Sequence, residues 1–183
     1  IFGYSSYNSV KYFEEVEIQD FKNSDREIPE MLYHVYRNII VFNHFNNELY
    51  VFENRLKNEE SQLDTLLSYI KKRTFPTYDF KLTSEETSNL TDDQFAEMVQ
   101  KGKDHCQRGD VFQIVVSRRF QQTFEGDEFN VYRTLRSVNP SPYLFFFDFG
   151  KFKIFGSSPE AQIVIKDQKA TIHPIAGTFR RTG

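Results

Sequence analysis

Four short strand-forming runs follow one another closely near the end of the chain, and they limit the folds that it can adopt. Aromatic and β-branched residues are frequent in these runs, which span 143–149, 152–155, 161–166 and 170–174. Only Gly150 and Lys151 separate the first two, which predicts a tight turn between them. Strands that follow helical segments in this way predict an α+β fold with mostly antiparallel β-sheets and flanking helices.

A second pair of strand-forming runs, 38–45 and 48–53, lies in the first half of the chain. Asn46 and Asn47 separate them, and asparagine tolerates the positive φ that tight hairpin turns require. The two runs therefore predict a β-hairpin. A further apolar run, 111–117, is almost continuous, which is typical of a strand buried on both faces.

Apolar residues at helical spacing predict three helices, near 58–73, 91–109 and 127–138. The second begins with a capping box, because the Thr91 side chain can accept from the Gln94 N–H while Gln94 bonds back. A glycine ends the second helix and an Asn-Pro pair ends the third.

Composition limits the core and the partners. The 183 residues match one ordinary domain and can bury a core, which we expect to be built mainly from the 20 Phe and 10 Tyr. The net charge of −3 argues against a general nucleic-acid binder, and no apolar run approaches the roughly 18 residues that span a membrane. A single Cys suits a reducing compartment, so we expect a cytoplasmic location without a signal peptide.

General catalytic motifs are scarce, but three segments are unusual. The four histidines show no metal-ligand spacing, and no glycine-rich phosphate loop is present. Residues 139–143 form a double-proline elbow, 156–160 combine small residues with a proline and a glutamate, and 174–178 precede Arg180 and Arg181. A stiff connection explains the elbow better than a site does, a solvated turn explains the second segment equally well, and the last segment could bind an anion. Each alone is a weak signal, but the three together are a much stronger one.

The chain resembles the chorismate-utilising enzymes and, among them, the anthranilate synthase component I family. Four stretches carry this resemblance in order: 108–118 (RGDVFQIVVSR), 135–143 (LRSVNPSPY), 155–160 (FGSSPE) and 173–178 (HPIAGT). It implies an incomplete chorismate-binding sandwich. Residues 1–75 would be the end of the family's N-terminal region, 76–90 a linker, and 91–183 the first part of the chorismate-binding domain.

The resemblance also implies the reaction. Family members that add water carry a lysine at the position of Gln113 in this sequence. Aminodeoxychorismate synthases commonly carry a lysine at the position of Ala176. Glutamine and alanine at these positions imply direct addition of ammonia. The implied enzyme is a lyase of tryptophan biosynthesis that converts chorismate and ammonia to anthranilate and pyruvate, with ammonia delivered by a glutamine amidotransferase subunit.

Individual roles follow by matching positions. Glu160 matches a general acid that protonates the departing C4 hydroxyl, for which burial would have to raise its pKa. Gln113 is the second catalytic candidate, and Gly177 and Thr178 match the substrate-binding pair. Mg²⁺ is the implied cofactor. No metal ligand is expected within this chain, because the family's metal-binding glutamates follow the Gly-Thr motif and would lie beyond residue 183.

The elbow has a further meaning in the family, which is feedback inhibition. Pro142, Tyr143 and Leu144 match residues that hold L-tryptophan, although methionine is usual at Leu144. Phe179 is another departure, since arginine commonly stands there. Both ends of the chain look cut, so we expect a piece of a longer enzyme that is inactive by itself.

Three alternatives remain open. An aminodeoxychorismate synthase component I, of the folate pathway, would use the same substrate and ammonia source. A non-catalytic module could bind an aromatic amino acid at the elbow. An aromatic strand at 150–155 superficially resembles those that bind single-stranded nucleic acid, but the charge argues against it. We therefore expect no nucleic-acid partner and no membrane partner.

Overall fold

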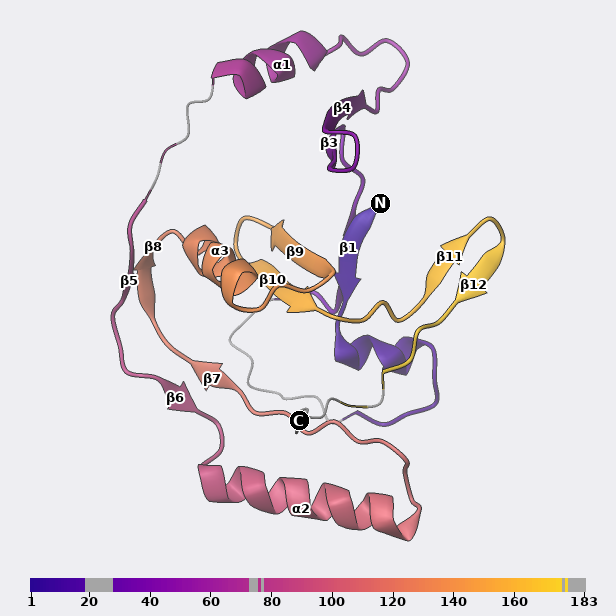
Figure 1. Ribbon diagram of the computed structural model, residues 1–183, viewed down its shortest axis with the longest axis vertical. Helices are drawn as coiled ribbons and strands as arrows, with labels where there is room; N and C mark the ends of the chain where they lie inside the picture. Colours follow the sequence, from indigo (N-terminus) through magenta and orange to yellow (C-terminus); the bar gives the residue numbers. More distant parts are fainter. Residues whose placement is uncertain (19–27, 73–75, 77, 176, 178–183) are drawn as a thin grey trace. The chain divides into compact units, whose positions relative to one another are not determined.

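The computed structural model describes residues 1–18, 28–72, 76, 78–175 and 177, and Figure 1 shows the order of its elements. The fold is α+β, as predicted, with antiparallel strand pairs and helices. The chain forms two compact units, which are described separately. Unit 1 comprises Ile1–Pro76 with Phe149–Phe152, and unit 2 comprises Thr77–Asp148 with Lys153–Gly183.

The described residues of unit 1 form two antiparallel strand pairs, β1 with β2 and β3 with β4, together with one α-helix and one 3₁₀ helix. These elements are β1 Phe2–Ser5, η1 Tyr7–Tyr12, β2 Met31–His34, β3 Asn38–Asn43, β4 Glu48–Glu53 and α1 Leu63–Lys72. The hairpin predicted at 38–53 is confirmed. Its turn contains Asn47, whose φ of 55° is the positive value that asparagine tolerates.

The helix predicted from residue 58 begins later, at Leu63, because the preceding residues fold back onto β4. The Glu53 carboxylate, whose side chain is only 3% exposed, accepts from the Gln62 N–H at 2.9 Å and from the Ser61 hydroxyl at 2.8 Å. It also binds Arg37 at 3.1 Å. These contacts fix the chain just before α1.

In the part of unit 2 that the structure describes there are four antiparallel strand pairs and two helices, namely β5 with β8, β6 with β7, β9 with β10, β11 with β12, α2 and α3. Their bounds are β5 Phe80–Leu82, β6 Thr87–Ser88, α2 Asp92–Arg108, β7 Phe120–Gln121, β8 Phe124–Gly126, α3 Phe129–Val138, β9 Tyr143–Asp148, β10 Lys153–Ser158, β11 Val164–Lys166 and β12 Lys169–Thr171. The predicted linker 76–90 thus includes two short strands. The domain boundaries at 75 and 91 remain a prediction.

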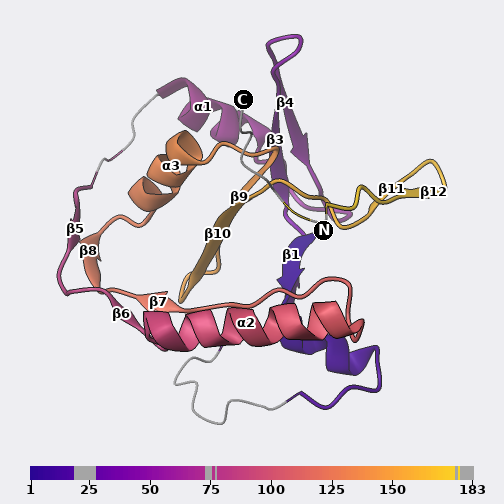
Figure 2. The ribbon, with the colours of Figure 1, turned by 60° about the horizontal axis from the view of Figure 1, so that its bottom comes forward.

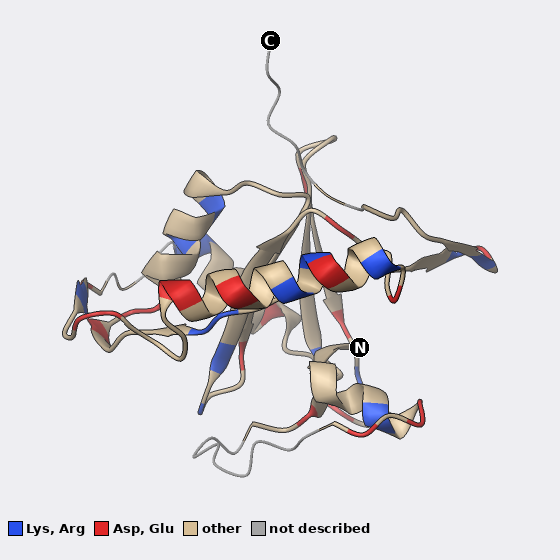
Figure 3. Ribbon diagram, turned by 90° about the horizontal axis from the view of Figure 1, so that it is seen from below, with Lys and Arg blue, Asp and Glu red and all other residues tan. Residues whose placement is uncertain are grey.

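Helix α2 forms as its sequence predicts. Thr91 and Gln94 make the full capping box, and Gly109 ends the helix with a φ of 81°. Acidic residues occupy its first turn and basic residues its last, which favours the helix dipole. Figure 3 shows charged residues along the face of α2 visible there, and Figure 2 shows the segment that follows α2 running beside it.

Helix α3 packs on the β9–β10 hairpin through aromatic rings. The Phe129 and Phe146 rings meet edge to face with centroids 5.0 Å apart, and Phe146 stacks on Phe155 at 5.6 Å. Tyr132 contacts both Phe146 and Phe155. This ring cluster fixes the hairpin against α3, and the hairpin in turn positions the candidate site.

The buried strand predicted at 111–117 is not formed. Ile114 and Val116 lie against Gly102 of α2, but Ile114 is still 48% exposed, and Phe112 and Val115 are more exposed than that. Within the described residues no neighbouring strand pairs with this segment. A strand needs such a partner for its backbone groups.

The predicted aromatic core is also wrong for the described residues. None of their apolar side chains is buried, although many rings pack pairwise and are half-buried. The physical reason is the sheet organisation, because every described sheet has two strands. Two-stranded sheets leave both faces open unless other elements cover them.

Candidate functional site

Segments that the sequence analysis singled out converge in unit 2 around one open hollow of about 460 Å³. One wall comes from the elbow and another from the segment after β10, while the residues after β12 complete the lining. The lining residues are Pro142, Tyr143, Pro159, Glu160, Ala161, Ile172, His173, Pro174 and Ile175. Residues far apart in sequence are thus gathered at one place.

The register of the β9–β10 hairpin explains why two of these segments meet. Tyr143, the first residue of β9, pairs with Ser158, the last residue of β10. The elbow therefore enters the hairpin where the segment with Glu160 leaves it. The predicted strand 152–155 extends to Ser158, so the small residues expected to form a turn belong partly to β10.

The third segment reaches the hollow through the β11–β12 hairpin. Val164 pairs with Thr171, so the chain returns beside the residues from which it departed. Asp167 and Gln168 form the tight turn, with φ values of 51° and 61°. Residues 172–175 consequently run back to the vicinity of Glu160, where they line the hollow.

Hydrogen bonds fix the two walls. The Ser157 hydroxyl donates to the Asn139 carbonyl oxygen at 2.6 Å, which holds the start of the elbow. The Ser158 hydroxyl contacts the backbone of Glu160, accepting from its N–H at 3.3 Å and donating to its carbonyl oxygen at 3.2 Å. The Glu160 side chain itself is exposed, so the described residues do not supply the burial that the general-acid role requires.

The tryptophan candidates are divided between the hollow and the strand. Pro142 and Tyr143 line the same hollow as Glu160. Leu144, by contrast, lies one position further along β9, is half-buried and pairs with Ser157. The predicted inhibitor elbow and the predicted catalytic acid therefore share one hollow.

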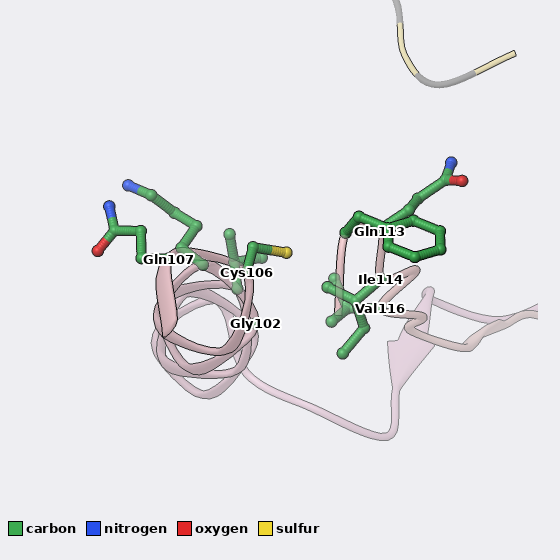
Figure 4. Close-up of a pocket in the computed structure, with 9 residues that line it drawn as sticks. Gly102, Cys106, Gln107, Gln113, Ile114 and Val116 are labelled. Atoms are coloured by element: carbon green, nitrogen blue, oxygen red, sulfur yellow. The ribbon is translucent and has the colours of Figure 1, made fainter. Parts of the chain in front are cut away.

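Gln113 is not among the residues that line this hollow. It borders a second one of about 420 Å³, between α2 and the segment 112–116, with Val99, Gly102, Lys103, Cys106, Gln107, Phe112, Ile114 and Val116. Figure 4 shows the Gln113 amide directed away from α2, whereas Cys106 points towards the segment. The structure therefore does not bring Gln113 and Glu160 into one site.

Of the two predicted substrate-binding residues, Gly177 and Thr178, only Gly177 lies within the described residues. Gly177 is exposed, and an added Cβ there would meet open space. Thr178, Ala176 and the following arginines lie outside the described residues. The prediction for the Gly-Thr pair therefore stays a prediction.

His173 is the site residue that the sequence analysis missed. It lines the hollow with Glu160 and Tyr143, so a carboxylate, an imidazole and a phenol border one space and could support proton transfer. The available signal was its place at the start of the 173–178 stretch. Histidine spacing alone could not reveal it, because the other three histidines lie elsewhere in the chain.

Among the described residues, no group of three or more His, Cys, Asp or Glu side chains could hold a metal ion. These residues therefore do not fit a magnesium site by themselves. No helix in the described ranges is long and apolar enough to cross a membrane.

Comparisons with known proteins agree with the motif order. A family model described as chorismate binding enzyme matches residues 1–183. Anthranilate synthase alpha subunit 2, chloroplastic, of Arabidopsis thaliana is 35% identical over 98% of this chain and 32% of its own length. Anthranilate synthase component 1 of Aquifex aeolicus is 32% identical over 98% of this chain and 38% of its own length.

A solved structure has the same fold over most of the chain. The crystal structure of anthranilate synthase component I from Streptococcus pneumoniae TIGR4 matches 90% of this chain with a TM-score of 0.70 and 32% identity. The match covers 39% of that structure's chain. The present chain thus spans about a third of the length of the curated relatives named above.

Proposed function

Because the chain belongs to the chorismate-binding enzyme family, we propose that it is part of an anthranilate synthase component I. This lyase converts chorismate and ammonia to anthranilate and pyruvate in tryptophan biosynthesis. One observation carries the proposal: the elbow, the Glu160 segment and the residues after β12 line a single hollow. Relatives named as anthranilate synthase subunits, which match 98% of this chain, support the proposal.

In the proposed reaction, ammonia adds at C2 of chorismate and the C4 hydroxyl leaves as water. Glu160 protonates that hydroxyl, and elimination of pyruvate then gives the aromatic ring. The Ser158 hydroxyl holds the Glu160 backbone through both its N–H and its carbonyl oxygen, and thereby fixes the place from which this side chain starts. Gly177 and Thr178 would hold the substrate through backbone donors and a hydroxyl.

Gln113 enters the proposal in a different way. The resemblance makes it the position that distinguishes ammonia from water as the nucleophile. It borders the hollow beside α2 rather than the hollow around Glu160. We therefore propose that Gln113 influences the choice of nucleophile and assign no proton transfer to it.

Cofactor and partners belong to the same proposal. Mg²⁺ would neutralise a substrate carboxylate, with ligands supplied from outside the described residues, and no step is assigned to it. A glutamine amidotransferase subunit would deliver ammonia, and L-tryptophan would act as feedback inhibitor at Pro142, Tyr143 and Leu144. A cytoplasmic location remains a prediction from the single cysteine.

The runner-up is an aminodeoxychorismate synthase. Incubation of the full-length protein with chorismate, ammonium and Mg²⁺ separates the two, because anthranilate is fluorescent and forms with pyruvate. We expect anthranilate and pyruvate in equal amounts. Accumulation of 4-amino-4-deoxychorismate without pyruvate would favour the runner-up.

The two binding-module alternatives have their own tests. For a non-catalytic module, calorimetry would detect tryptophan binding without any turnover of chorismate. The nucleic-acid alternative is weakened by the packing of strand 150–155, where Phe155 stacks on Phe146 and Lys153 binds Glu128. A salt-sensitive shift with a single-stranded oligonucleotide would restore it.

A further inference from the structure

The Ser157 hydroxyl joins two segments that flank the hollow around Glu160. It donates a 2.6 Å hydrogen bond to the carbonyl oxygen of Asn139. Asn139 is the C-cap of α3, and its own N–H bonds to the Leu135 carbonyl oxygen. The Ser157 bond therefore attaches the exact end of α3, where the elbow starts, to strand β10.

The elbow has few other means of attachment. Pro140 and Pro142 have no N–H, so Ser141 is the only residue between Asn139 and Tyr143 that can donate a backbone hydrogen bond. Tyr143 is held by strand pairing with Ser158. The elbow is thus fixed at its start by Ser157 and at its end by Ser158.

The same two serines lead directly into the other wall. Pro159 and Glu160 follow them in sequence, and Ser158 contacts the Glu160 backbone. Both walls of the hollow are therefore held by consecutive residues of one strand. In addition to the pairing of β9 with β10, the Ser157 hydrogen bond attaches the start of the elbow to β10.

We propose that Ser157 is a positioning residue, which holds the start of the elbow against β10 and so sets where Pro142 lies relative to Glu160 in the hollow. Loss of the hydroxyl would detach the start of the elbow from β10, although Asn139 would stay bonded to α3 and Ser158 would still hold Glu160. Loss of the hydroxyl should then raise the KM for chorismate more than it lowers kcat. Only this kinetic consequence rests on the proposed function, because the attachment itself is a property of the fold.

The test compares Ser157→Ala with Ser157→Thr, which keeps a hydroxyl, in the full-length protein. Ser137→Ala is the matched control, because the Ser137 hydroxyl donates to the Thr134 carbonyl oxygen within α3 at 2.8 Å and does not reach the hollow. Hydrogen exchange is measured at the Asn139 amide, which bonds to the Leu135 carbonyl oxygen, and at the Tyr143 amide, which lies in the strand pairing. The KM for chorismate and kcat are measured separately.

We expect Ser157→Ala to accelerate exchange at these amides and to raise KM about five-fold, as for the loss of one hydrogen bond, with a smaller change in kcat. Ser157→Thr should restore both values. Unchanged exchange, unchanged KM or an equal effect of Ser137→Ala would each overturn the proposal. If exchange responds as expected but the wild type does not consume chorismate, the attachment is supported and the proposed function fails.

Discussion

The Nζ of Lys153 lies 2.7 Å from Oε1 of Glu128 and 3.6 Å from Oδ1 of Asp148. Glu128 immediately precedes α3 and Lys153 begins β10, so the ion pair joins the helix to the hairpin that carries the site. The hydrogen bond from Lys153 lowers the pKa of Glu128 below its usual 4.5, and the same bond raises the pKa of Lys153 above 10.5.

These shifts predict how stability depends on pH. A carboxylate with a lowered folded pKa contributes stability above pH 4.5, and this contribution is lost as the pH falls through the folded pKa. The raised pKa of Lys153 contributes below pH 10.5 and is lost as the pH rises beyond that value. The ion pair should therefore stabilise unit 2 fully between these limits.

Glu128→Gln tests this dependence. We expect the variant to lower Tm by about 2–4 °C at pH 7, with a difference from wild type that shrinks towards pH 3. Thermal unfolding of the full-length protein at both pH values gives the comparison. Glu97→Gln, at an exposed position on α2, is the control, and a pH-independent loss in Glu128→Gln would contradict the account.

Gly126 should be intolerant of a side chain. Its φ is 100°, and an added Cβ would overlap the carbonyl oxygen of Asp79, which immediately precedes the facing strand β5. We expect Gly126→Ala to cost about 2–3 kcal/mol in urea unfolding, because strain and the loss of β5–β8 pairing add. Gly150→Ala isolates the strain, since its φ is 79° but the space is open, and it should cost about 1 kcal/mol. Equal costs would show that the close approach of the strands is not significant.

Tyr143→Ala tests the predicted inhibitor site. The ring is partly exposed and lines the hollow, so its loss should raise the tryptophan concentration for half-inhibition roughly ten-fold. Inhibition of anthranilate formation in the full-length protein gives this value. Tyr69→Ala, on α1, should retain wild-type inhibition, and unchanged inhibition in Tyr143→Ala would exclude the elbow as the tryptophan site.

Local structure was predictable from the sequence where neighbouring residues determine it. The capping box of Thr91 and Gln94, the asparagine turn at Asn47 and the helix stop before Pro140 form as expected. Each depends on interactions within a few residues. The antiparallel pairing of β9 with β10 followed from their short connection.

Features that depend on distant partners were not predictable. The apolar pattern at 111–117 indicated a buried strand, but the described chain offers α2 and no pairing strand. His173 joins Glu160 only because the β11–β12 hairpin returns the chain, and no spacing rule connects residues across such a hairpin. The order of the motifs was sufficient to indicate the family. That Gln113 and Glu160 line two different hollows could be seen only in the three-dimensional structure.

We propose that the hollow around Glu160 is a chorismate site in which this carboxyl group acts as the acid. Glu160→Gln in the full-length protein, with Glu86→Gln at an exposed position as control, is the most direct test. Chorismate affinity by calorimetry and anthranilate formation by fluorescence are measured for both. We predict that Glu160→Gln retains chorismate affinity and loses turnover by at least about 100-fold, whereas Glu86→Gln matches the wild type. Near-normal turnover in Glu160→Gln would contradict the claim.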